Sequence, residues 1–368
     1  MKRILRASVL TALLAAFTVG WRAPAPTGLI YPINMTLADD RLYVSDRHTG
    51  VHVFDVANPE APEAAFTIEL SGNRGTAVRG NIVYANDYRR LLVIRVEGDT
   101  YEVVKEIEST YEHEHPPVMM DTVDRGYGCS CPLGAQDDFA TAPQPSGGSG
   151  GTGSSFATFA VIDDYLYYLD YTDIVTMDIS TPEDPQELSR RRIGWDIETL
   201  FPTDALLFVG GARGMYIFDR SEPASPKEIG RVEHFRACDP VVVSGPVAYV
   251  TLRGESVCGG GRNVLLCVSI QNPSNPTIIG EKVLPSPYGL TVKDPFLYVS
   301  AGEDGFQLLD ISKPTDPKVL AGWADWPTKD FIWSGRFLYV LGFDDLRIFD
   351  VSEPGKPELL ATIEPGNT

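Results

Sequence analysis

Histidine and cysteine side chains, the usual ligands of zinc, gather in one segment of the chain. His113 and His115 flank a single glutamate, so both imidazoles face one side if this stretch is extended. Cys129 and Cys131 follow, and two imidazoles with two thiolates could complete a tetrahedral zinc site. The spacing differs from common zinc signatures, in which about two to four residues separate the cysteines. Two interpretations stay open: a metal site, or a surface loop whose thiols are free or paired.

Composition and charge exclude several classes of protein. The 368 residues are 43% hydrophobic and 22% charged, which is typical of a globular protein and not of a disordered or multi-span membrane chain. Lys and Arg number 31 against 50 Asp and Glu, a net charge of −19 that repels phosphate backbones and argues against nucleic-acid binding. The sequence holds no serine nucleophile elbow, phosphate-binding loop or dinucleotide fingerprint.

The first residues have the pattern of a signal peptide. Lys2, Arg3 and Arg6 precede an uncharged stretch, Ala7–Trp21, that is shorter than the roughly 20 residues a spanning helix needs. An uncleaved membrane anchor is the alternative. We expect residues 1–25 to be removed, and the mature chain, which has no other segment apolar enough to cross a bilayer, to be secreted, periplasmic or at the cell surface.

An apolar–aromatic pair recurs along the chain, with its rings 41, 83, 41, 41, 49 and 41 residues apart. A second apolar strand follows each pair. Two closely spaced prolines follow that strand in every copy but the second, and proline belongs in a connection because it cannot donate to a ladder. A period near 41 residues with four short strands is typical of a β-propeller blade. The sequence therefore predicts an all-β, seven-bladed β-propeller over residues 26–368. The pairs are Leu42–Tyr43, Val83–Tyr84, Leu166–Tyr167, Leu207–Phe208, Ala248–Tyr249, Leu297–Tyr298 and Leu338–Tyr339.

The 83-residue interval is close to two periods. Its segment 109–157 is rich in proline, contains a Gly/Ser/Thr run at 144–155, and has no aromatic pair. We expect an insertion between blades two and three, with a flexible Gly/Ser run. A hidden eighth blade is the alternative.

The strand that follows the aromatic pair resembles a known repeat. Leu308–Leu309–Asp310–Ile311–Ser312, followed by Lys313–Pro314, is similar to the LVIVD repeat of bacterial and archaeal surface or secreted proteins. Residues 237–260 look like the more typical bacterial members. The resemblance covers nearly the whole mature chain and implies a propeller on the cell envelope, with no defined reaction. The chain departs from the family pattern in its divergent second copy, in its insertion and in having no lipid-attachment cysteine after the leader.

The remaining cysteines can pair if the protein is secreted. Cys238 precedes a first strand and Cys258 lies in a Gly-rich insertion, so both would sit at one rim of a propeller. We expect a Cys238–Cys258 disulfide, whose loop of about 20 residues would add roughly 3 kcal/mol. Cys258–Cys267 is the alternative pair. Cys267 lies in the apolar run Val264–Val268 and is expected to be a buried free thiol.

Alignment of the copies indicates a ligand site at one mouth of the central channel. In each copy, the residue ten positions before the aromatic residue of the pair is expected to enter the innermost strand. The innermost strands line the central channel of a propeller. A concave mouth with a few convergent polar groups is a usual ligand site, and a polar rim that only meets water is the alternative. The column is Ile33, Arg74, Ala157, Glu198, Asp239, Tyr288 and Lys329, of which the charged and phenolic members Arg74, Glu198, Asp239, Tyr288 and Lys329 are the predicted ligand-binding residues.

These patterns favour a secreted or envelope-associated, non-catalytic propeller. It would bind a protein or glycan partner through its loop-bearing rim, from which the 109–157 insertion would project, and it would need no cofactor. The alternative is a metal-assisted hydrolase or lactonase at the channel mouth. A calcium ion there would need more oxygen ligands than Glu198 and Asp239 supply. The positive charges of Arg74 and Lys329 also disfavour a cation at this place. The sequence sets no oligomeric state.

Overall fold

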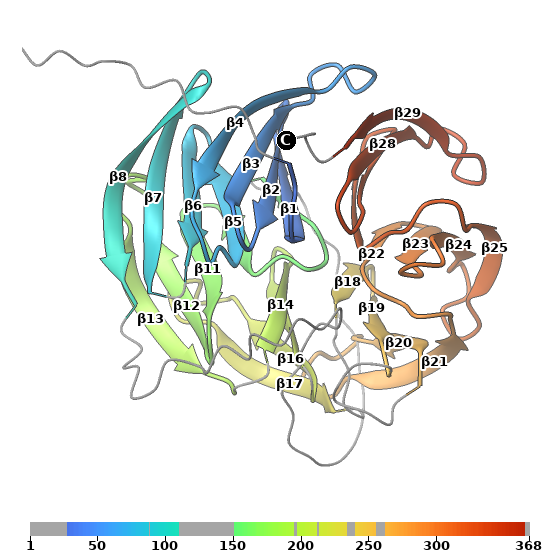
Figure 1. Cartoon of the computed structure of the whole chain (residues 1–368). Helices are drawn as coiled ribbons and strands as arrows, with labels where there is room; N and C mark the ends of the chain where they lie inside the picture. Colours follow the sequence, from blue (N-terminus) through green and yellow to red (C-terminus); the bar gives the residue numbers. More distant parts are fainter. Residues whose placement is uncertain are drawn as a thin grey trace, which may run out of the picture.

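The chain forms a ring of seven antiparallel sheets, seen along its axis in Figure 1. The computed structural model describes residues 28–87, 89–109, 151–194, 197–211, 213–233, 240–254 and 262–364. In these ranges the chain forms strands and turns, and no helix long and apolar enough to cross a membrane occurs in them. The predicted all-β, seven-bladed β-propeller is confirmed.

Each blade consists of four consecutive strands that hydrogen-bond in chain order. The innermost strands are β1 (Pro32–Ala38), β5 (Gly75–Arg79), β10 (Phe159–Ile162), β14 (Ile197–Pro202), β18 (Val241–Ser244), β22 (Leu290–Lys293) and β26 (Asp330–Ser334). The second strands are β2 (Arg41–Asp46), β6 (Ile82–Asn86), β11 (Tyr165–Asp170), β15 (Leu206–Gly211), β19 (Val247–Leu252), β23 (Phe296–Ser300) and β27 (Phe337–Leu341). The third strands are β3 (Gly50–Asp55), β7 (Arg90–Glu97), β12 (Asp173–Asp178), β16 (Gly214–Asp219), β20 (Val264–Ser269), β24 (Phe306–Asp310) and β28 (Leu346–Asp350). The outermost strands are β4 (Glu63–Glu69), β8 (Thr100–Glu108), β13 (Gln186–Arg192), β17 (Lys227–Glu233), β21 (Thr277–Val283), β25 (Lys318–Trp323) and β29 (Glu358–Ile363).

The repeated aromatic residue lies in the second strand of its blade and is buried. The Tyr167 hydroxyl in blade 3 donates to the carbonyl oxygen of Pro223 in blade 4 at 2.9 Å. Tyr298 in blade 6 makes the same bond to Pro354 in blade 7 at 2.6 Å. In these blades the tyrosine of one repeat thus binds the first of the two prolines of the next.

In blades 1, 3, 4, 6 and 7 an aspartate ends the third strand and begins the turn that carries the proline pair. Asp178 Oδ1 accepts a hydrogen bond from the Ser180 amide at 2.7 Å. Asp350 accepts one from Ser352 at the same distance. A short acidic side chain that bonds to the backbone two residues on favours a turn, so the strand stops there.

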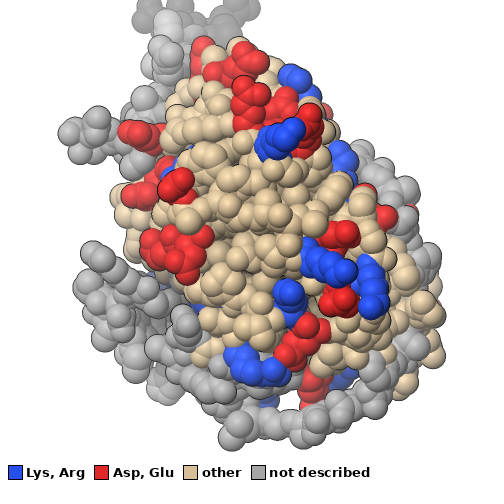
Figure 2. Space-filling model, turned by 90° about the vertical axis from the view of Figure 1, so that its right-hand side faces the viewer, with Lys and Arg blue, Asp and Glu red and all other residues tan. Residues whose placement is uncertain are grey.

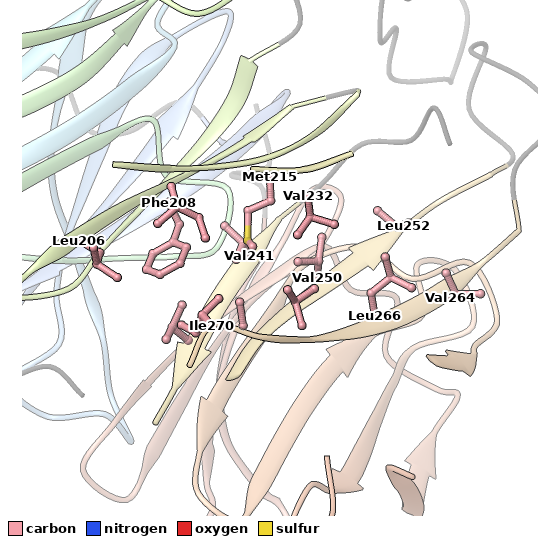
Figure 3. Packing of buried hydrophobic residues seen from close by; sticks show 14 residues of the cluster. Leu206, Phe208, Met215, Val232, Val241, Val250, Leu252, Val264, Leu266 and Ile270 are labelled. Atoms are coloured by element: carbon pink, nitrogen blue, oxygen red, sulfur yellow. The ribbon is translucent and has the colours of Figure 1, made fainter. Parts of the chain in front are cut away.

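The apolar core is divided into clusters between neighbouring blades. Figure 3 shows the boundary of blades 4 and 5, where Phe208 and Met215 pack against Val241, Val250 and Leu266. The described residues form one such cluster at each of the seven blade boundaries. Each blade carries apolar side chains on both faces of its sheet. Only a closed ring, in which every blade has a neighbour on either side, buries both faces.

The ring closes between blades 7 and 1 by the same packing. Met35 and Leu42 of blade 1 share a cluster with Ile332 and Tyr339 of blade 7. Neither blade contains a strand from the other end of the chain, so closure rests on side-chain contacts rather than on a shared sheet.

Blade 1 carries a further strand on its inner edge. The short strand β9 (Thr152–Gly153) pairs antiparallel with Thr36 and Leu37 of β1. Because β1 is an innermost strand, β9 lies inside the ring. The sequence predicts that the 109–157 insertion projects from the rim, which is wrong for its last residues, 151–157. Residues 110–150 and the predicted signal peptide lie outside the described residues.

Candidate functional site

The innermost strands all begin at one rim, called here the entry rim. Because neighbouring strands are antiparallel, the hairpins between the second and third strands lie at the same rim. Arg74 and Lys329 immediately precede β5 and β26, Tyr288 lies two residues before β22, and Glu198 is the second residue of β14. The aligned column therefore enters the innermost strands as the repeat predicts. Asp239 lies outside the described residues.

Lys329 is enclosed by protein at the boundary of blades 7 and 1. Its side chain is 5% exposed, and its Nζ donates to the carbonyl oxygens of Pro32 at 3.1 Å and Phe343 at 3.4 Å. Nζ also lies 5.3 Å from the ring centroid of Tyr31 and 5.0 Å from that of Phe343. Burial lowers the pKa of Lys329 to about 8, against the opposing effect of the nearby Asp46 and Asp344 carboxylates.

Tyr288 continues these contacts toward blade 5. Its ring meets Phe343 edge-on with centroids 5.8 Å apart. The guanidinium carbon of the buried Arg253 lies 3.8 Å from the Tyr288 ring centroid, a close cation–π contact.

The other end of the contacts reaches solvent in blade 1. The exposed Arg47 lies 5.1 Å from the Tyr31 ring centroid, and the exposed His48 meets that ring edge-on at 5.6 Å. Tyr31 is half-buried. Alternating rings and cations thus follow the entry rim over blades 5, 6, 7 and 1. This set is called here the aromatic–cation row: Arg253, Tyr288, Phe343, Lys329, Tyr31 and Arg47.

Two predicted site residues join this row and two lie elsewhere on the ring. Tyr288 and Lys329 are linked through Phe343. Arg74 instead places its guanidinium 4.8 Å from the ring centroid of Tyr171, at blades 2 and 3. Glu198 lies in blade 4 and is half-buried.

Sequence reasoning missed Arg47, Arg253 and Phe343, although a repeat column contains them. All three stand four residues after a marked ring, in the hairpin between second and third strands. Aligning this column in addition to the inner-strand column would have revealed the row. The column reads Arg47, Tyr88, Tyr171, Ala212, Arg253, Gly302 and Phe343.

A buried carboxylate holds the segment that runs inside the ring. Asp330 is completely buried, and its oxygens accept hydrogen bonds from Ser155 Oγ at 2.6 Å, the Ser155 amide at 3.3 Å and the Phe156 amide at 2.9 Å. Ser155 Oγ in turn accepts the Leu290 amide at 3.0 Å. Burial raises the pKa of Asp330 to about 6, and the hydrogen bonds oppose that rise.

The same segment bonds to further blades. The Gly151 amide donates to Val78 O at 3.0 Å in blade 2, and the Ser154 amide to Met35 O at 2.9 Å in blade 1. The Leu200 amide of blade 4 donates to Ala157 O at 2.7 Å. Residues 151–157, called here the channel segment, therefore occupy the centre of the ring and tie blades 1, 2, 4, 6 and 7 together.

The predicted metal and disulfide residues are mostly outside the described part of the chain. These are His113, His115, Cys129, Cys131, Cys238 and Cys258. Cys267 in β20 is a buried free thiol, as predicted, and burial raises its pKa to about 12. Within the described ranges no three His, Cys, Asp or Glu side chains are grouped so that they could hold a metal ion.

A repeat family matches the chain at its C-terminal blades. The LVIVD repeat model covers residues 288–322 and 328–364, which contain the strands of blades 6 and 7. The chain therefore contains two LVIVD repeats. A search among curated proteins finds no relative of this propeller.

Solved structures share the fold of this propeller at low sequence identity. A Lactobacillus plantarum protein has TM-score 0.60 and 12% identity, over 90% of this chain and 96% of that one. The periplasmic gluconolactonase PpgL of Pseudomonas aeruginosa has TM-score 0.60 and 10% identity, over 91% and 96%. BamB from Moraxella catarrhalis has TM-score 0.53 and 10% identity, over 84% and 81%. Such identities support a common fold and nothing finer.

Proposed function

We propose that this protein is an envelope-associated, non-catalytic β-propeller that binds a protein or glycan partner at its entry rim. The observation that carries the proposal is the aromatic–cation row. Its rings Tyr31, Tyr288 and Phe343 are half-buried, so each is fixed by the protein and still presents part of its surface.

The row has the properties of a preorganised binding surface. Aromatic rings offer large flat faces for sugar rings or apolar side chains, and they lose little conformational entropy on binding. The buried Lys329 and Arg253 hold the rings of Phe343 and Tyr288 through cation–π contacts. Exposed Arg47 and His48 add hydrogen-bond donors at one end of the row.

The filled channel supports binding at the rim rather than inside the ring. The channel segment takes the central position, and its donors saturate Asp330, the buried carboxylate of the innermost strand β26. A metal-assisted hydrolase at the channel mouth has less support, because this carboxylate is already committed to Ser155 and Phe156 of the same chain.

An envelope location is supported by several independent features. The LVIVD repeat is present, and the first residues have the charge and apolar pattern of a signal peptide. One propeller of similar fold is periplasmic by its name.

The test compares two pairs of substitutions on opposite rims. Tyr31→Ala with Arg47→Ala removes the solvent end of the row. Tyr165→Ala with Arg336→Ala removes the same residue types near the hairpins between first and second strands, at the other rim. Both variants and the wild type are immobilised and exposed to a solubilised envelope extract and to an oligosaccharide array.

We expect the first pair to lose at least about tenfold in capture, as removal of an aromatic or arginine hot spot does, and the control pair to keep wild-type capture. Equal capture by the two pairs would overturn the assignment of the rim.

A further inference from the structure

Every outermost strand contains a β-bulge at the same point of its ladder. In blade 6, Leu308 pairs with Ala321 and Leu309 with Val319, which leaves Leu320 without a partner. Bulges interrupt the regular edge of a strand and discourage edge-to-edge pairing. A contact at these edges is therefore made by side chains. The bulged residues are Ala65, Val104, Leu188, Ile229, Ile279, Leu320 and Leu360.

The residue before the bulge changes character around the ring. In blades 3 and 4 it is Glu187 and Glu228, each ion-paired with an arginine three residues on. In blades 5, 6 and 7 it is Ile278, Val319 and Leu359, with side chains 39%, 42% and 41% exposed. Equivalent positions thus carry charge on one side of the ring and apolar surface on the other.

The outermost strands of blades 6 and 7 present three exposed apolar side chains. Val319, Leu359 and the bulged Leu320, which is 53% exposed, are called here the outer band. Figure 2 shows this side of the molecule, where a broad central area without charged side chains is bordered by charged groups above it, below it and on the left. Exposed apolar patches of this kind mark interaction sites.

Blade 2 shows that an apolar residue before the bulge is not sufficient for such a surface. Val103 is 40% exposed but stands between Glu102 and Lys105. Both neighbours form ion pairs, with Arg95 and Asp184. Val103 therefore lies in a charged setting and serves as a matched control.

The charged residues that precede the outer band suit a contact between two copies of the chain related by a two-fold axis. Lys318 precedes Val319, and Glu358 precedes Leu359, so neighbouring blades carry opposite charges at equivalent positions. Both side chains are exposed. Lys318 lies opposite Asp310 across the ladder, where its charge adds to the hydrogen bonds that lower the pKa of that carboxyl, and it forms no salt bridge within 4 Å among the described residues. A two-fold axis parallel to the ring axis, between blades 6 and 7, exchanges the two positions.

We propose that the outer band binds a second copy of this chain and forms a two-fold symmetric dimer. Val319 of one copy then lies against Leu359 of the second copy, and Lys318 against Glu358 of the second copy. A chain of net charge −19 repels its own copies over most of its surface. Two copies can approach at the outer band, because its apolar side chains are flanked by the opposite charges of Lys318 and Glu358.

The first experiment is sedimentation velocity of the full chain from about 5 to about 500 µM, the range in which a small apolar interface associates. We expect dimers to appear as concentration rises. Val319→Glu is expected to abolish them without lowering the melting temperature, because glutamate stands at this position in blades 3 and 4. Val103→Glu is expected to leave the dimer unchanged.

A charge swap tests the orientation of the two copies. Lys318→Glu and Glu358→Lys should each weaken the dimer at least about fivefold, and the double variant should recover most of the loss, as coupled pairs do. Failure of the double variant to recover would overturn the two-fold arrangement.

Other outcomes are equally decisive. A wild type that stays monomeric to the highest concentration overturns the proposal, as does capture of a lipid vesicle or another protein by the outer band of a monomeric chain. The rim variants Tyr31→Ala and Arg47→Ala should dimerise normally. Failure of this proposal is therefore distinguishable from failure of rim binding.

Discussion

The hydroxyl of Tyr84 in blade 2 donates to the carbonyl oxygen of Pro182 in blade 3 at 2.8 Å. Burial raises the pKa of this hydroxyl well above its usual range, so it remains a donor. The two residues belong to the two marks that define the repeat, an aromatic residue in the second strand and a proline after the third strand. The same bond joins blade 3 to blade 4 and blade 6 to blade 7, so the fixed spacing of the two groups connects neighbouring blades.

Loss of one such hydroxyl should destabilise the ring measurably. Tyr298→Phe removes the donor to Pro354 O and leaves a partly enclosed carbonyl without its partner. We expect the free energy of unfolding to fall by about 1–2 kcal/mol, measured by urea denaturation. Tyr165→Phe, at the strand start of another blade and half-buried, is the control and should change it by less than about 0.5 kcal/mol. Equal effects of the two substitutions would contradict the role of the bond.

The proline turn of one blade packs closely against the outermost strand of the preceding blade, and in some blades the strand has a glycine at the point of contact. A Cβ on Gly230 in β17 would lie 2.0 Å from Pro273 O of the next blade, whereas a Cβ on Gly322 in β25 would meet nothing closer than 3.7 Å. Gly230→Ala should therefore lower the free energy of unfolding by about 2–3 kcal/mol through overpacking. Gly322→Ala should leave it unchanged or raise it slightly. Similar melting curves for the two variants would contradict this packing.

The fold could be predicted from the sequence because the same local residue pattern recurs from repeat to repeat. The aromatic pair, the strand-ending aspartate and the prolines recur in register. Few folds other than the β-propeller have a repeat of four short strands with a period near 41 residues. The inner ends of the strands followed from the same alignment, which correctly placed Arg74, Tyr288 and Lys329 at the entry rim.

The channel segment could not be predicted, because its contacts are not repeated. Ser155 meets Asp330 across 175 residues of chain, and no periodic signal connects them. The burial of Lys329 was missed for a related reason. A lysine in a polar column suggests a solvent-facing group, and only the packing of Tyr31 and Phe343 around it shows otherwise.

Replacement of Asp330 should release the channel segment. Asp330→Asn turns an amide NH₂ toward the Ser155 and Phe156 donors, which then lose an acceptor in a buried site. We expect the free energy of unfolding to fall by about 2–4 kcal/mol. We also expect faster hydrogen exchange of the amides in residues 154–156, measured by mass spectrometry.

The control for this release is Asp304→Asn, an exposed carboxylate in the hairpin between β23 and β24 at the same rim. It should leave both stability and exchange near wild-type values. Ser155→Ala removes one donor only and should give an intermediate loss. Unchanged exchange in Asp330→Asn would show that the segment is held without the carboxylate.

The enclosed ammonium of Lys329 should make stability depend on alkaline pH. The pKa of this lysine is about 8 in the folded chain and about 10.5 when it is unfolded and solvated. Between these values the unfolded state holds one more proton, so the free energy of unfolding rises with pH by up to about 1.4 kcal/mol per unit. Lys329→Met removes this titration and keeps the volume. The difference in urea stability between wild type and Lys329→Met should therefore shift in favour of the wild type by about 2 kcal/mol from pH 7 to pH 10. A difference that stays constant over this range would mean that Lys329 is as well solvated in the folded chain as in the unfolded one.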